Sequence, residues 1–355
     1  MTSDLRLPRS QLLVAASLLV GLLAGNGWSQ IRGPQLGYVF DQSQGVLRPI
    51  LGVPGASRLG DPLPLEVPLA LAEISSKQDY ALGVTQGDGK LVLVTFGEGD
   101  QPSSVQTIES LGLGASHITL SGEGKSAAVL FSESQSLRIL SGLPEKPQVT
   151  GEVDLRLAGF PEASALDDDG KLVILSVSEN QGSRISLYSH ETGLQSLGIF
   201  GKVSALKLST DQQVLIADRA TQEVVLIRDV LGAAQRIRIA AREDGIDDPV
   251  ALDFSRDRKR VFVANAGSGT VTGLDLRGGP PVVTACRCEP TTLKRLEGNS
   301  VFRITELSEK PFLLLESTPE GDRILFVPAS SEPRASRARR EREQTHTMRV
   351  PPVAR

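Results

Sequence analysis

Residues Asp253 to Leu276 read DFSRDRKRVFVANAGSGTVTGLDL, and this stretch indicates how the whole chain is built. The apolar run that ends at Phe254 is followed by a polar turn and then by a strand-forming segment, 261–263. Further turns separate this segment from two more strands, 271–276 and 282–285. Four short strands joined by turns predict one antiparallel meander.

The same unit recurs four times upstream. Its first strands begin near Leu71, Ser116, Ala163, Ser204 and Val250, at spacings of 45, 47, 41 and 46 residues. A polar turn follows each first strand, for example SGEGK (121–125) and DDDGK (167–171). Such spacings are typical of β-propeller blades and exceed those of short helical repeats. We therefore expect an all-β propeller within residues 31–330.

The two ends of the repeat region indicate how the ring closes. Strands are still predicted after Cys288, at 291–296, 301–305, 312–316 and 323–327, and two more precede the first unit, at 38–40 and 46–50. Because open sheet edges are avoided, we expect the two N-terminal strands to complete the last blade beside 312–316 and 323–327. The 292 residues from Gly37 to Pro328 give about 42 per blade for seven four-stranded blades and about 49 for six. Seven fits the spacing better, and six is the alternative.

The segment RVFVANAGSGTVTGLDL (260–276) resembles the YVTN repeat of bacterial surface and periplasmic propellers. That repeat reads roughly D-G-x-x-L-Y-V-A-N-x-x-S-G-T-V-S-V-I-D, and the other units match it more weakly. The resemblance implies a propeller similar to lactonase and surface-layer proteins. It covers only positions that build the blade, so it transfers no catalytic residue.

Both termini differ in composition from the repeats. Residues 1–30 have a basic start, a short apolar run (Leu12–Ala24) and a small-residue exit, which predict a secretory signal peptide and a periplasmic or secreted protein. An uncleaved N-terminal membrane anchor is the alternative. Residues 331–355 contain seven Arg and three Glu and predict a disordered tail, or alternatively an electrostatic tether to an anionic surface.

Composition narrows the class of ligand. The body between these ends carries a net charge of −9, which argues against nucleic-acid binding. Aromatic residues make up 4% of the chain, which argues against a carbohydrate platform. The single Trp, Trp28, lies outside the repeats, which weakens a quinone-cofactor hypothesis. We expect no cofactor and a monomer.

Candidate catalytic and metal-binding motifs are weak. His117, His190 and His346 accompany no nucleophile motif, and His117 falls in a first strand near the central channel. SGEGKS (121–126) lacks the first glycine of a phosphate-binding loop. Asp167–Asp169 could hold Ca²⁺ but occupies a repeated turn position. We predict no catalytic residue and no metal site.

Cys286 and Cys288 are the only cysteines, and export favours a disulfide between them. In a regular strand the Cα atoms of residues i and i+2 lie about 6.5 Å apart, which is near the upper limit of Cα separations for a disulfide. The bridge therefore requires a kinked backbone. Free thiols are the alternative.

Two function classes follow from the sequence. The first is an exported, non-catalytic propeller that engages an envelope or secreted protein, or a small ligand at the channel mouth, through one face. The second is a lactonase-like or other hydrolase with its active site at the channel, which rests on fold analogy alone. Because second-to-third turns vary most between units, we predict ligand or partner contacts there. The predicted contact residues are Glu133, Glu179, Asn180, Asp218, Arg219 and Asn265.

Overall fold

A computed structural model describes residues 33–97, 102–209, 211–296, 300–308 and 310–328. The ring of sheets belongs to the unit from Pro34 onward. The predicted signal peptide and the predicted tail lie outside the described residues. No helix in the described part of the chain is long and apolar enough to cross a membrane.

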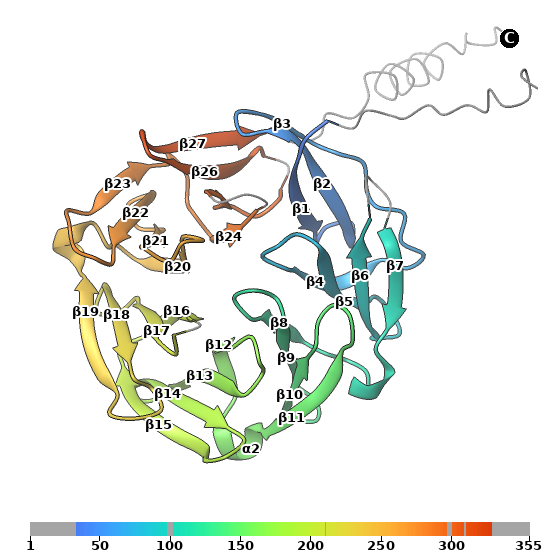
Figure 1. Cartoon of the computed structure of the whole chain (residues 1–355), viewed down its shortest axis with the longest axis horizontal. Helices are drawn as coiled ribbons and strands as arrows, with labels where there is room; N and C mark the ends of the chain where they lie inside the picture. The colour runs from blue at the N-terminus through green and yellow to red at the C-terminus, as the bar shows by residue number, and fades with distance from the viewer. Residues whose placement is uncertain (1–32, 98–101, 210, 297–299, 309, 329–355) are drawn as a thin grey trace, which may run out of the picture. The chain divides into compact units, whose positions relative to one another are not determined.

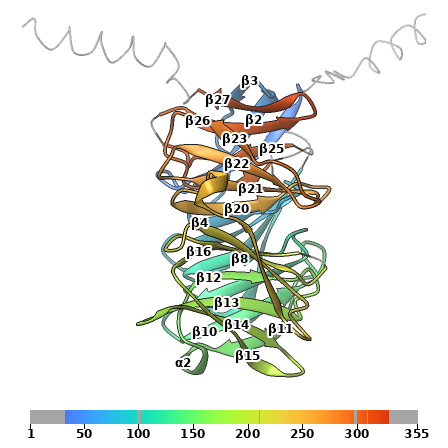
Figure 2. The same ribbon diagram turned by 90° about the vertical axis from the view of Figure 1, so that its left-hand side faces the viewer.

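Seven antiparallel sheets follow one another around a ring, as Figure 1 shows, and Figure 2 views this ring edge-on. Blade 1 comprises β4 (Leu69–Ile74), β5 (Tyr80–Thr85), β6 (Leu91–Phe96) and β7 (Pro102–Thr107). Blade 2 comprises β8 (His117–Leu120), β9 (Ser126–Phe131), β10 (Ser136–Ser141) and β11 (Gln148–Asp154). Blade 3 comprises β12 (Pro161–Leu166), β13 (Leu172–Glu179), β14 (Gly182–Ser189) and β15 (Gly193–Phe200).

The second half of the chain continues the same pattern. Blade 4 comprises β16 (Val203–Leu208), β17 (Val214–Asp218), β18 (Glu223–Arg228) and β19 (Gln235–Ala240). Blade 5 comprises β20 (Pro249–Phe254), β21 (Arg260–Asn265), β22 (Thr270–Asp275) and β23 (Val282–Ala285). Blade 6 comprises β24 (Lys294–Arg295), β25 (Val301–Arg303), β26 (Phe312–Thr318) and β27 (Gly321–Val327). Blade 7 comprises β1 (Gln35–Asp41), β2 (Val46–Val53) and β3 (Ala56–Leu59).

The seven-bladed, all-β propeller is therefore confirmed, with little helix among the described residues. The short helices are η1 (Glu109–Leu111), α2 (Leu155–Ala158) and η2 (Arg242–Asp244). The first strand of each blade is the innermost, so β4, β8, β12, β16 and β20 surround the central channel (Figure 1).

Ring closure differs from the sequence prediction in one respect. The N-terminal strands do not pair with β26 and β27, because the C-terminal segment already supplies four strands of its own. They form a separate sheet with β3, which contacts β27, while β1 contacts β4 (Figure 1). The turn Pro54–Gly55 allows β3, since Gly55 has φ +82°, as the third position of a type II turn requires. The strand β3 was not among the strands predicted from sequence.

Apolar residues fill the spaces between neighbouring blades. Every residue of β5, β9 and β17 is buried, because a neighbouring blade covers each face of these strands. The cluster between blades 1 and 2, for example, joins Tyr80 and Leu82 to Val129 and Phe131. Because each sheet buries both faces against its neighbours, the blades depend on one another for their cores.

The recurrent first-to-second turn has a repeated polar cap. The hydroxyl of Ser121 accepts a hydrogen bond from the N–H of Lys125 (3.0 Å), and Asp167 accepts one from the N–H of Lys171 (2.8 Å) in the same repeat position. Burial raises the pKa of Asp167, opposed by the N–H groups that it accepts. Asp167 therefore has the role of a turn cap. The described residues contain no group of three or more His, Cys, Asp or Glu placed to hold a metal ion.

Candidate binding groove and channel

The second-to-third turns emerge on one face of the ring, together with the connections that lead into each first strand. This follows from antiparallel pairing, since the start of β12 at Pro161 lies opposite Val177 near the end of β13. We call this the upper face and the opposite one the lower face. All six contact residues predicted from sequence lie on the upper face, but they differ in how they are used.

Two of the predicted residues are buried and hold the backbone together. Asp218 is 2% exposed and accepts hydrogen bonds from the N–H groups of Gly201 (2.7 Å), Lys202 (2.9 Å), Ala220 (3.0 Å) and Thr221 (3.2 Å). Its carboxylate therefore joins the turn of blade 4 to the connection from blade 3, and almost all of it is buried.

Asn265 has a similar structural role in blade 5. It is fully buried, accepts from the N–H of Asp247 (3.2 Å) and donates to the hydroxyl of Thr272 (3.0 Å) and the carbonyl of Val263 (3.3 Å). The conspicuous Asn of the repeat motif thus fixes the turn between β21 and β22.

The other four predicted residues are exposed. Arg219 forms an ion pair with Asp248 of the next connection, and Glu179 accepts from Nε of Arg184 (2.5 Å). Asn180 lies beside Glu179 in the turn after β13, and Glu133 lies in the turn after β9. The structure does not bring the six together, because their blades carry them to separate positions around the ring (Figure 1).

The upper face has a groove between blades 2 and 3 that the sequence analysis did not find. Its volume is about 240 Å³. Leu130 and Leu137 belong to the buried core between these blades, and Phe160 and Pro161 contribute the opposite wall. Phe160 is 45% exposed, so a large part of its ring is accessible from the groove. The feature of the sequence that could have indicated this groove is an aromatic residue, Phe160, in a connection between two blades.

A short helix and a glycine position Phe160. The helix α2 is capped by Asp154, which accepts from the N–H of Arg156 (2.9 Å). The helix ends at Gly159, whose φ is +87° and whose added Cβ would lie 2.7 Å from the side chain of Val177. Glycine is therefore required both by the backbone conformation and by the close approach. The connection after Gly159 therefore places Phe160 at the rim of the groove.

The groove opens inward to the channel, where a second cavity of about 230 Å³ lies between the first strands. Both cavities are lined by His117, Glu162, Ala163 and Ser164, so they adjoin. The hydroxyl groups of Ser164 and Thr119 lie 2.7 Å apart and join β12 to β8 across the channel wall.

Charged residues of opposite sign alternate deeper in the channel. Lys294 of β24 pairs with Glu73 of β4, while Nζ of Lys207 lies 3.6 Å from a carboxylate oxygen of Asp253. Arg295 donates to the carbonyl of Phe254 (2.9 Å) and lies 3.5 Å from Asp253. These groups line a cavity of about 80 Å³ that opens toward the lower face. Most of the channel charge is thus compensated within the protein.

His117 begins β8 and is exposed where groove and channel meet. Desolvation by the surrounding protein holds the pKa of His117 below its ordinary value of 6.5, Glu73 opposes this shift, and Lys294 adds to it. This shift favours the neutral imidazole, which can accept a hydrogen bond at its unprotonated nitrogen. Its side chain has no hydrogen-bond partner among the described residues.

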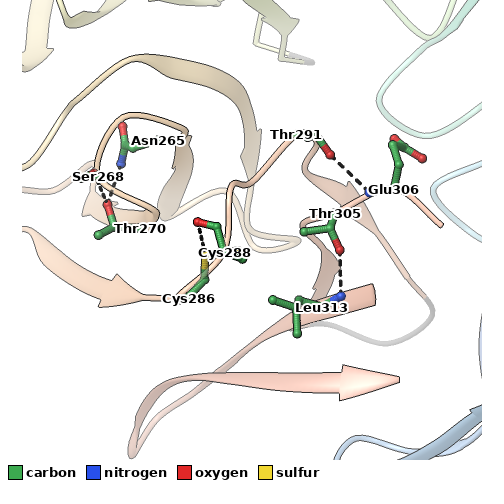
Figure 3. Close-up of a disulfide and its surroundings, with 9 residues drawn as sticks. All are labelled: Asn265, Ser268, Thr270, Cys286, Cys288, Thr291, Thr305, Glu306 and Leu313. Atoms are coloured by element: carbon green, nitrogen blue, oxygen red, sulfur yellow. Dashed lines mark hydrogen bonds between the residues drawn. A yellow bond between two sulfur atoms is a disulfide. The ribbon is translucent and has the colours of Figure 1, made fainter. Parts of the chain in front are cut away.

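The cysteines lie on the upper face of blade 5, beside the turn that carries Asn265 (Figure 3). The structure joins Cys286 to Cys288 in a disulfide with a Cα–Cα distance of 5.1 Å. This is shorter than the spacing of a regular strand because β23 ends at Ala285 and Arg287 adopts φ +52°. The backbone kink that the bridge requires is therefore present.

Comparison with known proteins shows the fold of this chain but neither its family nor its function. No family model matches the chain, so the YVTN family itself is not confirmed, and no curated protein matches it. Among solved structures, a streptogramin B lyase structure covers 76% of this chain and 86% of its own, with 13% identity and a TM-score of 0.52.

Two further structures are similar to the same degree. A catalytically inactive virginiamycin B lyase from Staphylococcus aureus with quinupristin covers 72% of this chain and 83% of its own, at 13% identity and a TM-score of 0.51. A functionally unknown protein from Desulfotomaculum acetoxidans covers 70% and 78%, at 14% identity and a TM-score of 0.50. At such identities, the likeness establishes a seven-bladed β-propeller fold.

Proposed function

We propose that this protein is an exported, non-catalytic β-propeller that binds a ligand or partner through its upper face. The groove between blades 2 and 3 supports this proposal best. It combines an exposed aromatic wall at Phe160, an apolar floor at Leu130 and Leu137, and polar groups at its inner end. Ligand sites in proteins are typically concave, mostly apolar and supplied with a few polar groups.

The proposed site lies on the upper face, where the sequence predicted ligand or partner contacts, but it is centred on other residues. Glu133 lies next to Ser132, which lines the groove, so this turn can contribute to binding. Asp218 and Asn265 are occupied by backbone hydrogen bonds, and a ligand would have to displace those bonds to reach them. We therefore centre the proposed site on blades 2 and 3.

The groove can be tested with the uncharged apolar dye Nile red. We expect the wild-type chain to enhance the dye's fluorescence saturably, and Phe160→Ser to abolish most of the enhancement. Leu231→Ser is the matched control, because Leu231 is 49% exposed and lies in the turn between β18 and β19 on the lower face. Equal loss in both variants, or no loss in either, would contradict the proposal.

Export is a separate part of the proposal, supported by the charge and apolar pattern of residues 1–30. We expect the protein recovered from its native cell envelope to begin between Gly25 and Ile31. Mass spectrometry of the N-terminal peptide measures this. Recovery of an intact N-terminus in the membrane fraction would favour the anchor instead.

A further inference from the structure

The groove and the channel cavity together point to one chemical class of ligand. We infer that they bind a small amphipathic organic cation, with its apolar part between blades 2 and 3 and its ammonium group beside Glu162 and His117. This inference rests on the proposed function and adds the ligand's charge and orientation to it.

The apolar half of such a ligand has a defined place. Leu130 and Leu137 are 7% and 1% exposed in the whole chain, so they present only a small surface, which faces the groove. Phe160 and Pro161 close the other side. An alkyl chain or ring inserted here would cover the exposed part of Phe160, which is favourable because apolar area leaves water.

The charge of the ligand follows from which polar groups are already used. At the junction of the two cavities, Ser164 is bonded to Thr119, and Ser116 is bonded to Ser132 (2.6 Å). Deeper in the channel, Lys294 is paired with Glu73 and Lys207 with Asp253. The lysines are therefore compensated and offer little attraction to an anion.

Two groups at the junction have no hydrogen-bond or ion-pair partner among the described residues. They are the carboxylate of Glu162 and the imidazole of His117, which line both cavities. A carboxylate only accepts hydrogen bonds, and a neutral imidazole can accept one at its unprotonated nitrogen. Both groups are complementary to a cationic N–H donor.

The charge of the whole body favours the same ligand. Residues 31–330 carry a net charge of −9, which raises the local concentration of cations near the surface. The two adjoining cavities, of about 240 and 230 Å³, have the size of a small-molecule site. A short alkylammonium ion therefore matches the site in charge, polarity and size.

The experiment uses three probes with the same carbon chain: octylammonium, octan-1-ol and octanoate. Isothermal titration calorimetry at pH 7.5 compares their affinities for the full chain. We expect octylammonium to bind most tightly and octanoate most weakly. Glu162→Gln should weaken octylammonium binding about ten-fold, since a charge-assisted hydrogen bond is lost, and leave octanol unchanged. Phe160→Ser should weaken both.

Glu191→Gln is the matched control for net charge. Glu191 is exposed in the turn between β14 and β15 on the lower face, so removing its charge should not alter binding of any probe. Equal weakening by Glu162→Gln and Glu191→Gln would show that only the overall charge matters and would overturn the site.

Other outcomes separate the inference from the proposed function. The cation assignment would be overturned if octanoate bound more tightly than octylammonium, or if Glu162→Gln did not weaken octylammonium binding. The groove itself would still be supported if Phe160→Ser weakened octanol binding. Failure of all three probes, with Nile red also unaffected by Phe160→Ser, would overturn both.

Discussion

The turn after β17 in blade 4 and the turn after β9 in blade 2 occupy the same place in the repeat and each carries an acidic residue. Asp218 is buried and accepts four backbone hydrogen bonds, whereas Glu133 is exposed and lies beside the groove. The difference arises because Asp218 is the last residue of β17, within reach of the N–H groups of Gly201 and Lys202 in the neighbouring connection, whereas Glu133 lies within the turn itself. A polar residue in a variable turn is therefore evidence of binding only when the backbone around it does not need its oxygen atoms.

The largest expected effect is that of Asp218→Ala on stability. Four backbone N–H groups would lose their acceptor, and we expect the free energy of unfolding to fall by about 3 kcal/mol. Glu133→Ala should change it by less than about 0.5 kcal/mol, as is usual for surface positions. Urea denaturation followed by circular dichroism measures both. Similar values for the two variants would remove the distinction between the turns.

The next effect is that of Asn265→Ala in blade 5, which we expect to be about 2 kcal/mol, because one buried side chain both donates and accepts. The same urea experiment applies. Asn180→Ala is the matched control, since Asn180 is exposed in the corresponding turn of blade 3. A loss for Asn180→Ala as large as that for Asn265→Ala would contradict the assignment of roles.

A smaller effect is expected for Arg219→Ala. Arg219 pairs with Asp248, and hydrogen bonding to this carboxylate raises the pKa of Arg219, but the pair is largely accessible to water. Exposed ion pairs contribute about 0–1 kcal/mol and are weakened by salt. We expect a loss within this range at low salt that diminishes at high salt. A salt-independent loss above about 2 kcal/mol would instead indicate a buried structural role like that of Asp218.

The fold followed from sequence because blade spacing and turn chemistry are local properties. Polar turns at intervals of 41 to 47 residues predicted five blades directly. The strand β3 was missed because its hairpin contains Pro and Gly, which also mark loops. The pairing at ring closure was wrong because β3, which the sequence prediction did not include, gives the N-terminal strands a sheet of their own.

The candidate site was less accessible to sequence reasoning. Asp218 and Asn265 stand out in sequence as polar residues in variable turns, yet their hydrogen-bond partners include connections 16 to 18 residues away. The groove is formed by Leu130, Phe160 and Glu162 from two blades, and nothing in a single repeat unit reveals that these residues meet. Packing between blades creates the site, so only the assembled ring shows it.

The smallest expected effect concerns His117, a free group like Glu133. Because its pKa in the folded chain lies below 6.5, the unfolded chain binds a proton that the folded chain does not as the pH falls through this value. Folding stability should therefore decline slightly from pH 7.5 toward acid. The charged groups that line the same cavity are Glu73, Glu162, Lys207 and Lys294, and they are present in both chains when wild type is compared with His117→Gln. The variant should lose less stability over this interval, by a small amount because the side chain is exposed to water. Thermal unfolding at a series of pH values measures the difference.

A greater loss in His117→Gln than in wild type would show that protonated His117 stabilises the fold. His117 would then be part of the structural network rather than a group available to a ligand.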